Sequence, residues 1–455
     1  MERQEGVTRE VADFATRLRY EDLPGEVVEK AKDCILDQLG VELIGSTLEW
    51  NKIPYRYVVD MGGKAESTIV NYGTRTLALD AAFVNATFGQ GCELDDVGFG
   101  SGGHLSAATV PVAFALCEKT RASGKDVIAS IVVGCDVMYR MLLSVRPSAN
   151  KRGFHSHGIG GPFGATVTAA KLLHLTDNEM LNAFGIAGSH SAGSTEYDRT
   201  GGEVKRVHAG LAARAGIQSA TLAKLGLTGP PTIIEGERGF CRVFSDRHNV
   251  DVITENLGAD FKIMRVWFKI YPCVSTVQSA IDLLARLTRQ HNIGSEDIQE
   301  IRVGLSETAV LHGPTIYEPH DVASAQFSLP FSLALRALKN ENDLSLYMDP
   351  NLWRDEAVLA LAKKVKAYAV GEAKGDKNYL TRMEITLRDG RIVQELQEFP
   401  RGSPLNPVSR DDLRTKFTRL ASVVLPTNRI HQLIDEVDQL EKLSDVSGLL
   451  PLLVQ

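Results

Sequence analysis

Three short stretches of the chain concentrate side chains that can transfer protons or bind anions. Glu93-Leu94-Asp95-Asp96 is followed by a glycine-rich link and then by His104. The second stretch is Phe154-His155-Ser156-His157-Gly158, and the third is Lys205-Arg206-Val207-His208-Ala209-Gly210. The last two interrupt segments rich in Ala and Gly, which pack closely as helices and leave little room for charge. Imidazoles and a lysine in that setting need a partner, either one another or an anionic ligand.

The acidic stretch and the histidine after it predict acid-base chemistry. Three carboxylates within four residues repel one another, so at least one is expected to bind a cation or to have a raised pKa. The glycines between Gly98 and Gly103 allow a turn that brings His104 to these acids. An imidazole can accept and donate a proton near neutral pH, so His104 is the predicted proton-transfer residue. A solvated acidic loop is the alternative interpretation.

Two glycine-rich segments could be mistaken for nucleotide-binding loops. Gly98–Gly103 lacks the Gly-Lys-Ser/Thr sequence of a phosphate-binding loop. Gly158-x-Gly160-Gly161-x-x-Gly164 follows Lys151–His155, which is not the apolar strand that a dinucleotide fingerprint requires. We therefore expect no nicotinamide or other cofactor, and interpret the second set of glycines as sites of close helix packing.

Composition restricts the class of protein. The chain has 455 residues, which favours two domains, and its 44% hydrophobic and 24% charged residues are typical of a globular protein. A net charge of −7 without a basic run argues against a nucleic-acid partner. We find no signal-peptide core and no run of about 18 apolar residues, and expect no membrane association. The six cysteines are scattered, which favours reduced thiols and a cytoplasmic protein.

Hydrophobic periodicity predicts an all-helical first region and an α+β region after it. A four-residue capping pattern begins at Thr176, and Pro24 is expected near the start of a helix. Alternating residues predict strands at 301–305 and 382–387, and Asp389-Gly390 predicts a tight hairpin turn into a further strand at Ile392-Val393. The predicted helices are 77–90, 105–121, 125–145, 162–174, 177–190, 208–225, 273–289, 326–338 and 354–365, with helical periodicity again at 409–440.

Five motifs, in this order, resemble the MmgE/PrpD family. They are the acidic stretch with His104, Gly153-Phe154-His155, Lys205-x-x-His208-Ala209-Gly210, Lys269-x-Tyr271-Pro272-Cys273 and Arg401-Gly402-Ser403-Pro404-Leu405-Asn406-Pro407. The resemblance extends from Val7 to about Phe417. The family includes 2-methylcitrate dehydratases, cis-aconitate decarboxylases and an iminodisuccinate epimerase. It implies a mainly α homodimer whose large discontinuous helical domain (1–267 and 401–455) carries an inserted α+β lid domain (268–400).

The resemblance also implies the site residues. It assigns catalytic roles to His104, His155, Lys205, Glu93 and Asp95, and substrate binding to Asp96, His157, His208, Lys269, Tyr271 and Gln278, with no metal. Lys205 would bind a substrate carboxylate as a point charge, while Arg206 is expected to be exposed. Glu93 or Asp95, together with His104, His155, Lys205 and Gln278, is expected to face one cleft between the two domains. Glu93, Val97, His157, Ser275 and Gln278 differ from the family's usual residues, so hydrogen bonding and positive charge at the site are expected to differ too.

These features predict a cofactor-independent lyase that transfers a proton next to a carboxylate of a small di- or tricarboxylic acid. A 2-methylcitrate dehydratase-like reaction is the leading hypothesis. Decarboxylation of an aconitate-like acid and epimerisation of an iminodisuccinate-like acid remain open, because each needs a base, a carboxylate-binding cation and a dry cleft. A metal-dependent hydrolase using Glu93, Asp95, His104 and His155 and a catalytically silent binding protein are the weaker alternatives.

Overall fold

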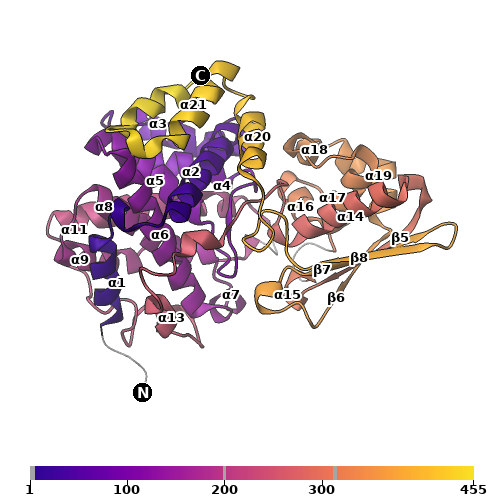
Figure 1. Ribbon diagram of the computed structural model, residues 1–455, viewed down its shortest axis with the longest axis horizontal. Coiled ribbons are helices and arrows are strands. Elements are labelled where there is room, and N and C mark those ends of the chain that lie inside the picture. The colour runs from indigo at the N-terminus through magenta and orange to yellow at the C-terminus, as the bar shows by residue number, and fades with distance from the viewer. Residues whose placement is uncertain (1–5, 198–200, 311–314) are drawn as a thin grey trace. The chain divides into compact units, whose positions relative to one another are not determined.

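The computed structural model describes residues 6–197, 201–310 and 315–455, and the chain forms two compact units. The first unit contains Met1–Val266 and Ser409–Gln455, and the second contains Trp267–Val408. The boundaries thus lie at 266/267 and 408/409, compared with 267/268 and 400/401 in the division made from sequence. The first unit is discontinuous in sequence, since its last helices follow the second unit along the chain (Figure 1).

Helices build the first unit, which confirms the expected mainly α fold, and two-residue strands are small additions to it. Of these strands, β1 (Ser67–Thr68) and β2 (Arg75–Thr76) pair antiparallel, and β3 is Val97–Gly98. The helices are α1 (Val7–Arg17), α2 (Gly25–Gly45), α3 (Lys52–Met61), α4 (Ala78–Gln90), α5 (Leu105–Thr120), α6 (Gly124–Val145), α7 (Ser148–Lys151), α8 (Ser156–Leu172), α9 (Asp177–Gly188), α11 (His208–Lys224), α12 (Phe240–Phe244), α13 (Asp251–Thr254), α20 (Arg410–Ala421) and α21 (Thr427–Asp438).

Local sequence signals set two of these helix starts. Thr176 caps α9: its hydroxyl accepts from the Glu179 N–H, and the Glu179 carboxylate accepts from the Thr176 N–H. This reciprocal pair is the predicted capping box. Pro24 stands immediately before α2, where its missing N–H removes no helical hydrogen bond.

The start of α8 was predicted wrongly. Sequence placed a helix at 162–174, but α8 begins at Ser156 and continues through Pro162. Proline has no N–H to offer the carbonyl four residues earlier. The Gly158 carbonyl instead accepts from the Ala192 N–H at 3.2 Å, so the helix continues through the proline without an unpaired acceptor.

Small residues let the central helices approach closely. An added Cβ at Gly164 in α8 would lie 2.9 Å from the Gly134 carbonyl oxygen of α6. At Gly210 in α11, it would lie 2.4 Å from the Phe83 carbonyl oxygen of α4. Real Cβ contacts are essentially never this short, so larger residues would force the helices apart. These glycines therefore allow α8 to lie close to α6 and α11 to lie close to α4.

One described helix, α6, is long and apolar enough by composition to cross a membrane, which corrects the expectation that no such stretch exists. However, 94% of its most apolar 18-residue window is buried inside the protein. α6 packs against α5 and α8. Contacts with neighbouring helices therefore account for its apolar character.

The second unit combines helices with a four-stranded sheet of order β6-β5-β7-β8. β5 and β6 are parallel, whereas β5 with β7 and β7 with β8 are antiparallel. The strands are β5 (Ile298–Leu305), β6 (Val365–Ala369), β7 (Thr381–Leu387) and β8 (Ile392–Gln397), and β4 (Val266–Trp267) lies at the boundary of the units. The helices are α14 (Gln278–His291), α15 (Glu307–Val310), α16 (Val322–Phe327), α17 (Leu329–Lys339), α18 (Leu344–Met348) and α19 (Glu356–Ala362).

Sequence predicted three of the four sheet strands and the turn between two of them. Asp389-Gly390 joins β7 to β8, and Gly390 has the positive φ of 88° that such a turn requires. The strand β6 was missed, since the helix predicted at 354–365 ends at Ala362 instead. Lysines at 363, 364 and 366 obscure the alternation of this short strand.

The structure predicts a pH-dependent effect of the buried Glu42 in α2. Burial raises the pKa of its carboxyl from the usual 4.5 to about 8, although Gln38 donates a hydrogen bond of 3.0 Å to it. Between these pH values the folded protein retains a proton that the unfolded chain releases, so the contribution of Glu42 to stability falls as pH rises through this window. Glu42→Gln should therefore raise the melting temperature more at pH 8 than at pH 5. The corresponding difference in unfolding free energy is on the order of a few kcal/mol.

Thermal unfolding of the wild type and the variant at both pH values checks this expectation. Glu26→Gln is the matched control, since Glu26 is exposed in the first turn of the same helix. An equal change in melting temperature at pH 5 and pH 8 for Glu42→Gln would show that Glu42 is already ionised.

Candidate functional site

The first unit places His104 beside the acidic stretch. The His104 Nδ1 atom lies 2.7 Å from the Asp96 carbonyl oxygen and 3.0 Å from Asp95 Oδ2. Both of these atoms are acceptors, so Nδ1 carries a proton and donates it. In the neutral imidazole Nε2 then holds the lone pair and can act as a base, and once protonated it can act as an acid. The glycine-containing turn from Gly98 produces this placement, as the Gly98 N–H donates to the Gly103 carbonyl at 2.6 Å.

Three helices begin at histidines that lie close together. His104 is the N-cap of α5, His155 is the N-cap of α8, and His208 is the first residue of α11. The ring centroids of His104 and His155 are 6.4 Å apart, and those of His155 and His208 are 4.9 Å apart. A helix N-terminus carries partial positive charge and favours anions. The convergence of three such ends makes this region suited to a carboxylate ligand.

His155 and His208 form a hydrogen-bonded pair, with 2.7 Å between their Nδ1 atoms. One Nδ1 donates and the other accepts, so each ring fixes the tautomer of the other. Burial lowers the pKa of His155 well below its usual value, with His208 and Lys205 adding to the effect. Burial, followed by Lys205, lowers the pKa of His208 to about 4. The pair is therefore uncharged at neutral pH.

The ring of His157 lies next to that of His104, with 5.7 Å between the ring centroids. Its Nδ1 accepts from the His104 backbone N–H at 3.3 Å, and its ring is buried. Burial lowers its pKa well below the usual value, and the neighbouring His104 adds to this effect, whereas Asp95 opposes it. The structure thus gives this residue a contact with the backbone of His104, where the sequence suggested contact with substrate.

The Asp96 side chain binds Ser106 in the first turn of α5. Its carboxylate accepts from the Ser106 N–H at 3.0 Å and from the Ser106 hydroxyl at 2.7 Å. Burial raises its pKa to about 6, although these hydrogen bonds oppose the shift. The side chain of Asp96 therefore anchors the helix, and its carbonyl orients His104.

Glu93 and Lys205 form an ion pair within the same unit. Lys205 lies in the short 3-10 turn Val204–Val207 that leads into His208 of α11, and its charge contributes to the lowered pKa values of His155, His157 and His208. An ammonium carries three donors, so it can bind Glu93 and a substrate carboxylate together. Glu93 has a φ of 57°, which a non-glycine residue adopts at a cost of roughly 1–2 kcal/mol.

The expectation that Arg206 is exposed is wrong. Its side chain is buried, donates to the Gly91 carbonyl and lies over the Trp50 ring, 4.3 Å from the ring centroid. A guanidinium can stack on an aromatic ring while its N–H groups bind a carbonyl, which a sequence pattern does not reveal.

The remaining predicted residues belong to the second unit and have partners there. The Gln278 amide accepts from the Tyr271 N–H at 3.1 Å and donates to the Tyr271 carbonyl at 2.7 Å, so it holds the turn before α14. The Tyr271 hydroxyl donates to Asp282 at 2.8 Å, and burial raises the pKa of Tyr271. Lys269 is buried in this unit. These contacts give Gln278 and Tyr271 structural uses that the motif alone did not suggest.

Sequence reasoning missed Tyr197. Its ring stands edge-on to His155, with 5.8 Å between centroids, and lies 6.0 Å from the ring of His208. Tyr197 lies outside all five motifs, so no spacing signal marked it. Within the described ranges 6–197, 201–310 and 315–455, no three His, Cys, Asp or Glu side chains form a group that could hold a metal ion.

Comparison with known proteins agrees with the motifs. The model of the MmgE/PrpD N-terminal domain matches residues 9–253, and that of the MmgE/PrpD C-terminal domain matches residues 271–442. The chain is 29% identical to a cis-aconitate decarboxylase from Aspergillus terreus, in an alignment covering 98% of this chain and 96% of that protein.

Two further relatives are more distant or match less of the chain. A cis-aconitate decarboxylase from Homo sapiens is 26% identical, with 98% of this chain and 94% of that protein covered. A 2-methylcitrate dehydratase-like protein from Aspergillus oryzae is 26% identical over 36% of this chain and 35% of its own length. Decarboxylases and dehydratases of this kind are both lyases. Since the two domain models together span most of its length, the chain belongs to the MmgE/PrpD family.

Proposed function

We propose that this lyase of the MmgE/PrpD family decarboxylates cis-aconitate or a closely similar unsaturated tricarboxylic acid. The observation that carries the proposal is the contact of His104 Nδ1 with two acceptors, in a site that also contains the Lys205 ammonium. This arrangement provides a proton-transfer group and a carboxylate-binding cation in one place. The relatives that match almost the whole chain are cis-aconitate decarboxylases, which favours this substrate class.

The chemistry requires one proton and no redox partner. Loss of CO2 from the saturated arm of cis-aconitate leaves the bonding electron pair on the adjacent carbon. That pair forms a new double bond, and the former double bond passes its electrons to the next carbon, which takes up a proton. The transient negative charge builds up next to a carboxylate. The products are CO2 and a dicarboxylic acid with a terminal methylene group.

Each site residue has a part in this reaction. His104 donates the proton from Nε2, while the Asp95 carboxylate, 3.0 Å from Nδ1, stabilises the charged ring. Lys205 binds a carboxylate and stabilises the negative charge that develops beside it. His155 and His208 are both neutral, and the ring whose Nδ1 accepts carries its proton on Nε2, so the pair offers one hydrogen bond to a remaining carboxylate without adding net positive charge, while the three helix N-termini provide the favourable field.

Decarboxylation now ranks above the dehydration that sequence placed first. The dehydratase-like relative covers about a third of the chain, whereas the decarboxylases cover 98% of it. Epimerisation remains a weaker alternative, since it needs the same proton transfer without loss of CO2. The metal-dependent hydrolase and the silent binding protein are not favoured, because the relatives are lyases.

The proposal includes a cytoplasmic homodimer. All six cysteines are free and buried, which suits a reducing compartment. Ile53, Tyr57 and Met61 recur every four residues on α3 and are 60%, 47% and 70% exposed, so they form an apolar stripe that a second copy could cover. Light scattering at micromolar concentration should report about twice the chain mass, and a monomer would exclude this part of the proposal.

Reaction in D2O tests the proposed function and separates the alternatives. Purified, chelator-treated protein should convert cis-aconitate to CO2 and a methylene dicarboxylic acid that carries one deuterium on its saturated CH2 group, as seen by proton NMR. Water loss from 2-methylcitrate without CO2 release would favour the dehydratase. Deuterium exchange into iminodisuccinate without net loss of material would favour the epimerase.

His104→Gln should reduce turnover by roughly 10²–10⁴-fold with little change in KM, because glutamine can form hydrogen bonds but cannot transfer the proton. Steady-state kinetics of CO2 release measures this. His431→Gln, the same change at an exposed position in α21, is the control. Turnover of His104→Gln close to that of the wild type would assign the proton transfer to another residue.

Lys205→Ala should raise KM and lower kcat together, because the ammonium binds the carboxylate in the ground state and interacts more strongly with the negative charge that develops in the transition state. The exposed Lys64→Ala should change neither parameter. A rise in KM alone would contradict the proposed stabilisation of developing charge, since it would show that Lys205 contributes equally to both states.

A further inference from the structure

Lys416 of α20 reaches the acidic stretch from the C-terminal part of the chain. Its Nζ lies 2.6 Å from Asp37 Oδ1 of α2 and donates to the Leu94 carbonyl at 3.0 Å. The Lys416 and Asp37 side chains are only 6% and 2% exposed. A buried charged side chain therefore binds the backbone between Glu93 and Asp95, more than 300 positions earlier in the sequence.

The bonded carbonyl lies where the backbone needs support. Glu93 has a left-handed conformation that a side chain disfavours, and such a conformation persists only when its surroundings hold it. Leu94 is its neighbour, and Asp95, which contacts His104 Nδ1, is the residue after that. A hydrogen bond to the Leu94 carbonyl thus restrains both Glu93 and Asp95.

Stability alone does not explain this buried pair. Removing two charges from water costs about as much as their attraction returns, and a pair of apolar side chains would often be at least as stable. Asp37 pairs with the ammonium, but the pair also makes one specific contact, with the backbone of the acidic stretch. That contact gives the pair a use that apolar residues could not supply.

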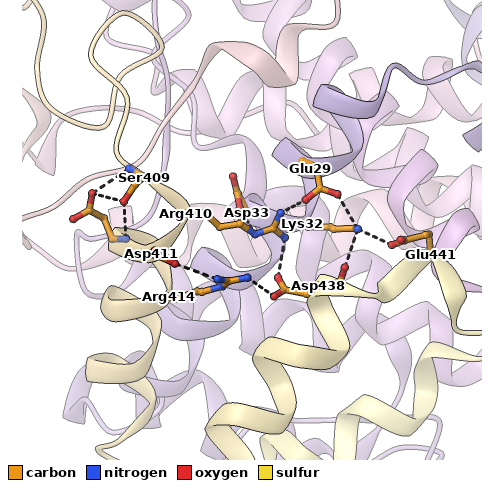
Figure 2. Close-up of polar contacts among 10 residues, drawn as sticks. Glu29, Lys32, Asp33, Ser409, Arg410, Asp411, Arg414, Asp438 and Glu441 are labelled. Carbon is orange, nitrogen blue, oxygen red and sulfur yellow. Dashed lines mark hydrogen bonds and ion pairs between the residues drawn. The ribbon is translucent and has the colours of Figure 1, made fainter.

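A second set of ion pairs joins α20 to α2 and α21 (Figure 2). Arg410 and Arg414 both bind Asp438 of α21, at 2.8 and 2.5 Å, and Arg410 also pairs with Glu29 of α2. The arginine side chains are 28% and 37% exposed, so this cluster is accessible to solvent, in contrast to Lys416. The two sets of contacts can therefore be altered separately.

We propose that Lys416 is a positioning residue for Glu93 and Asp95, and that helix α20, which follows the second unit in the sequence, thereby takes part in building the candidate active site. Lys416 acts by holding the Leu94 carbonyl, which keeps Asp95 against His104 and Glu93 against Lys205. Where turnover is the readout, this inference rests on the proposed decarboxylase function. A readout without substrate makes it independent of that function.

Three variants separate positioning from simple charge compensation. Lys416→Met keeps the aliphatic stem and removes the ammonium. The double variant Lys416→Met with Asp37→Leu also removes the carboxylate that would be left unpaired. Arg414→Gln, on the same helix, is the control, because it weakens the exposed cluster and leaves the Leu94 contact unchanged. Each variant is compared with the wild-type full-length chain by thermal unfolding, by amide hydrogen exchange of residues 91–98, and by kcat and KM on cis-aconitate.

We expect Lys416→Met to speed exchange in residues 91–98 and to lower kcat about 10- to 100-fold, as misplacement of catalytic groups by about 1 Å does. The double variant should recover the melting temperature of the wild type. Its amide exchange in residues 91–98 should remain fast, and its kcat should remain low. Arg414→Gln should lower the melting temperature while kcat stays within about twofold of the wild type, as expected for loss of an exposed ion pair.

Recovery of both exchange and kcat in the double variant would overturn the inference, since Lys416 would then only neutralise Asp37. If Lys416→Met does not fold, the double variant alone decides between these outcomes. If the wild type does not act on cis-aconitate, the proposed function fails, while exchange in residues 91–98 still tests the role of Lys416.

Discussion

The bond from His104 Nδ1 to the acidic stretch is the interaction on which the rest of the site depends. The Asp96 carbonyl accepts from this nitrogen and Asp95 Oδ2 lies 3.0 Å from it, so Nδ1 carries the proton and Nε2 holds the lone pair in the neutral ring. A carboxylate that orients a histidine and stabilises its charged form is a common way to make an imidazole an effective acid or base. Here the backbone of the same stretch also supplies an acceptor, so a small shift of residues 93–96 changes two contacts at once.

Burial of four histidines near one another is possible because most of them stay uncharged. Burial lowers the pKa values of His155, His157 and His208, and neighbouring positive charge strengthens the effect. Lys205 and three helix N-termini thus place positive potential near these neutral rings, which favours an anion. Close helix packing at small residues, including Gly164 and Gly210, lets these N-termini meet.

Sequence alone predicted the mainly α fold, and it indicated candidate site residues without showing their contacts. Motifs indicated His104, His155 and Lys205 as candidates, and local rules predicted the Thr176 cap and the Asp389-Gly390 turn, because each depends on a few adjacent residues. Other features of the fold and the site depend on contacts between residues that are far apart in the sequence. The Ala192 N–H that lets α8 pass Pro162 lies about thirty residues away in sequence, and Lys416 reaches Leu94 from the end of the chain. No pattern in a single sequence encodes such pairings.

Nitrogen-15 NMR of the histidine rings in the substrate-free enzyme tests the central claim most directly. At a pH where His104 is neutral, its Nδ1 should show the chemical shift of a protonated nitrogen and its Nε2 that of an unprotonated one. In Asp95→Asn this preference should weaken, because the charged acceptor is lost while the Asp96 carbonyl remains. A His104 ring protonated on Nε2 in the wild type, or one that averages between the two tautomers, would contradict the account.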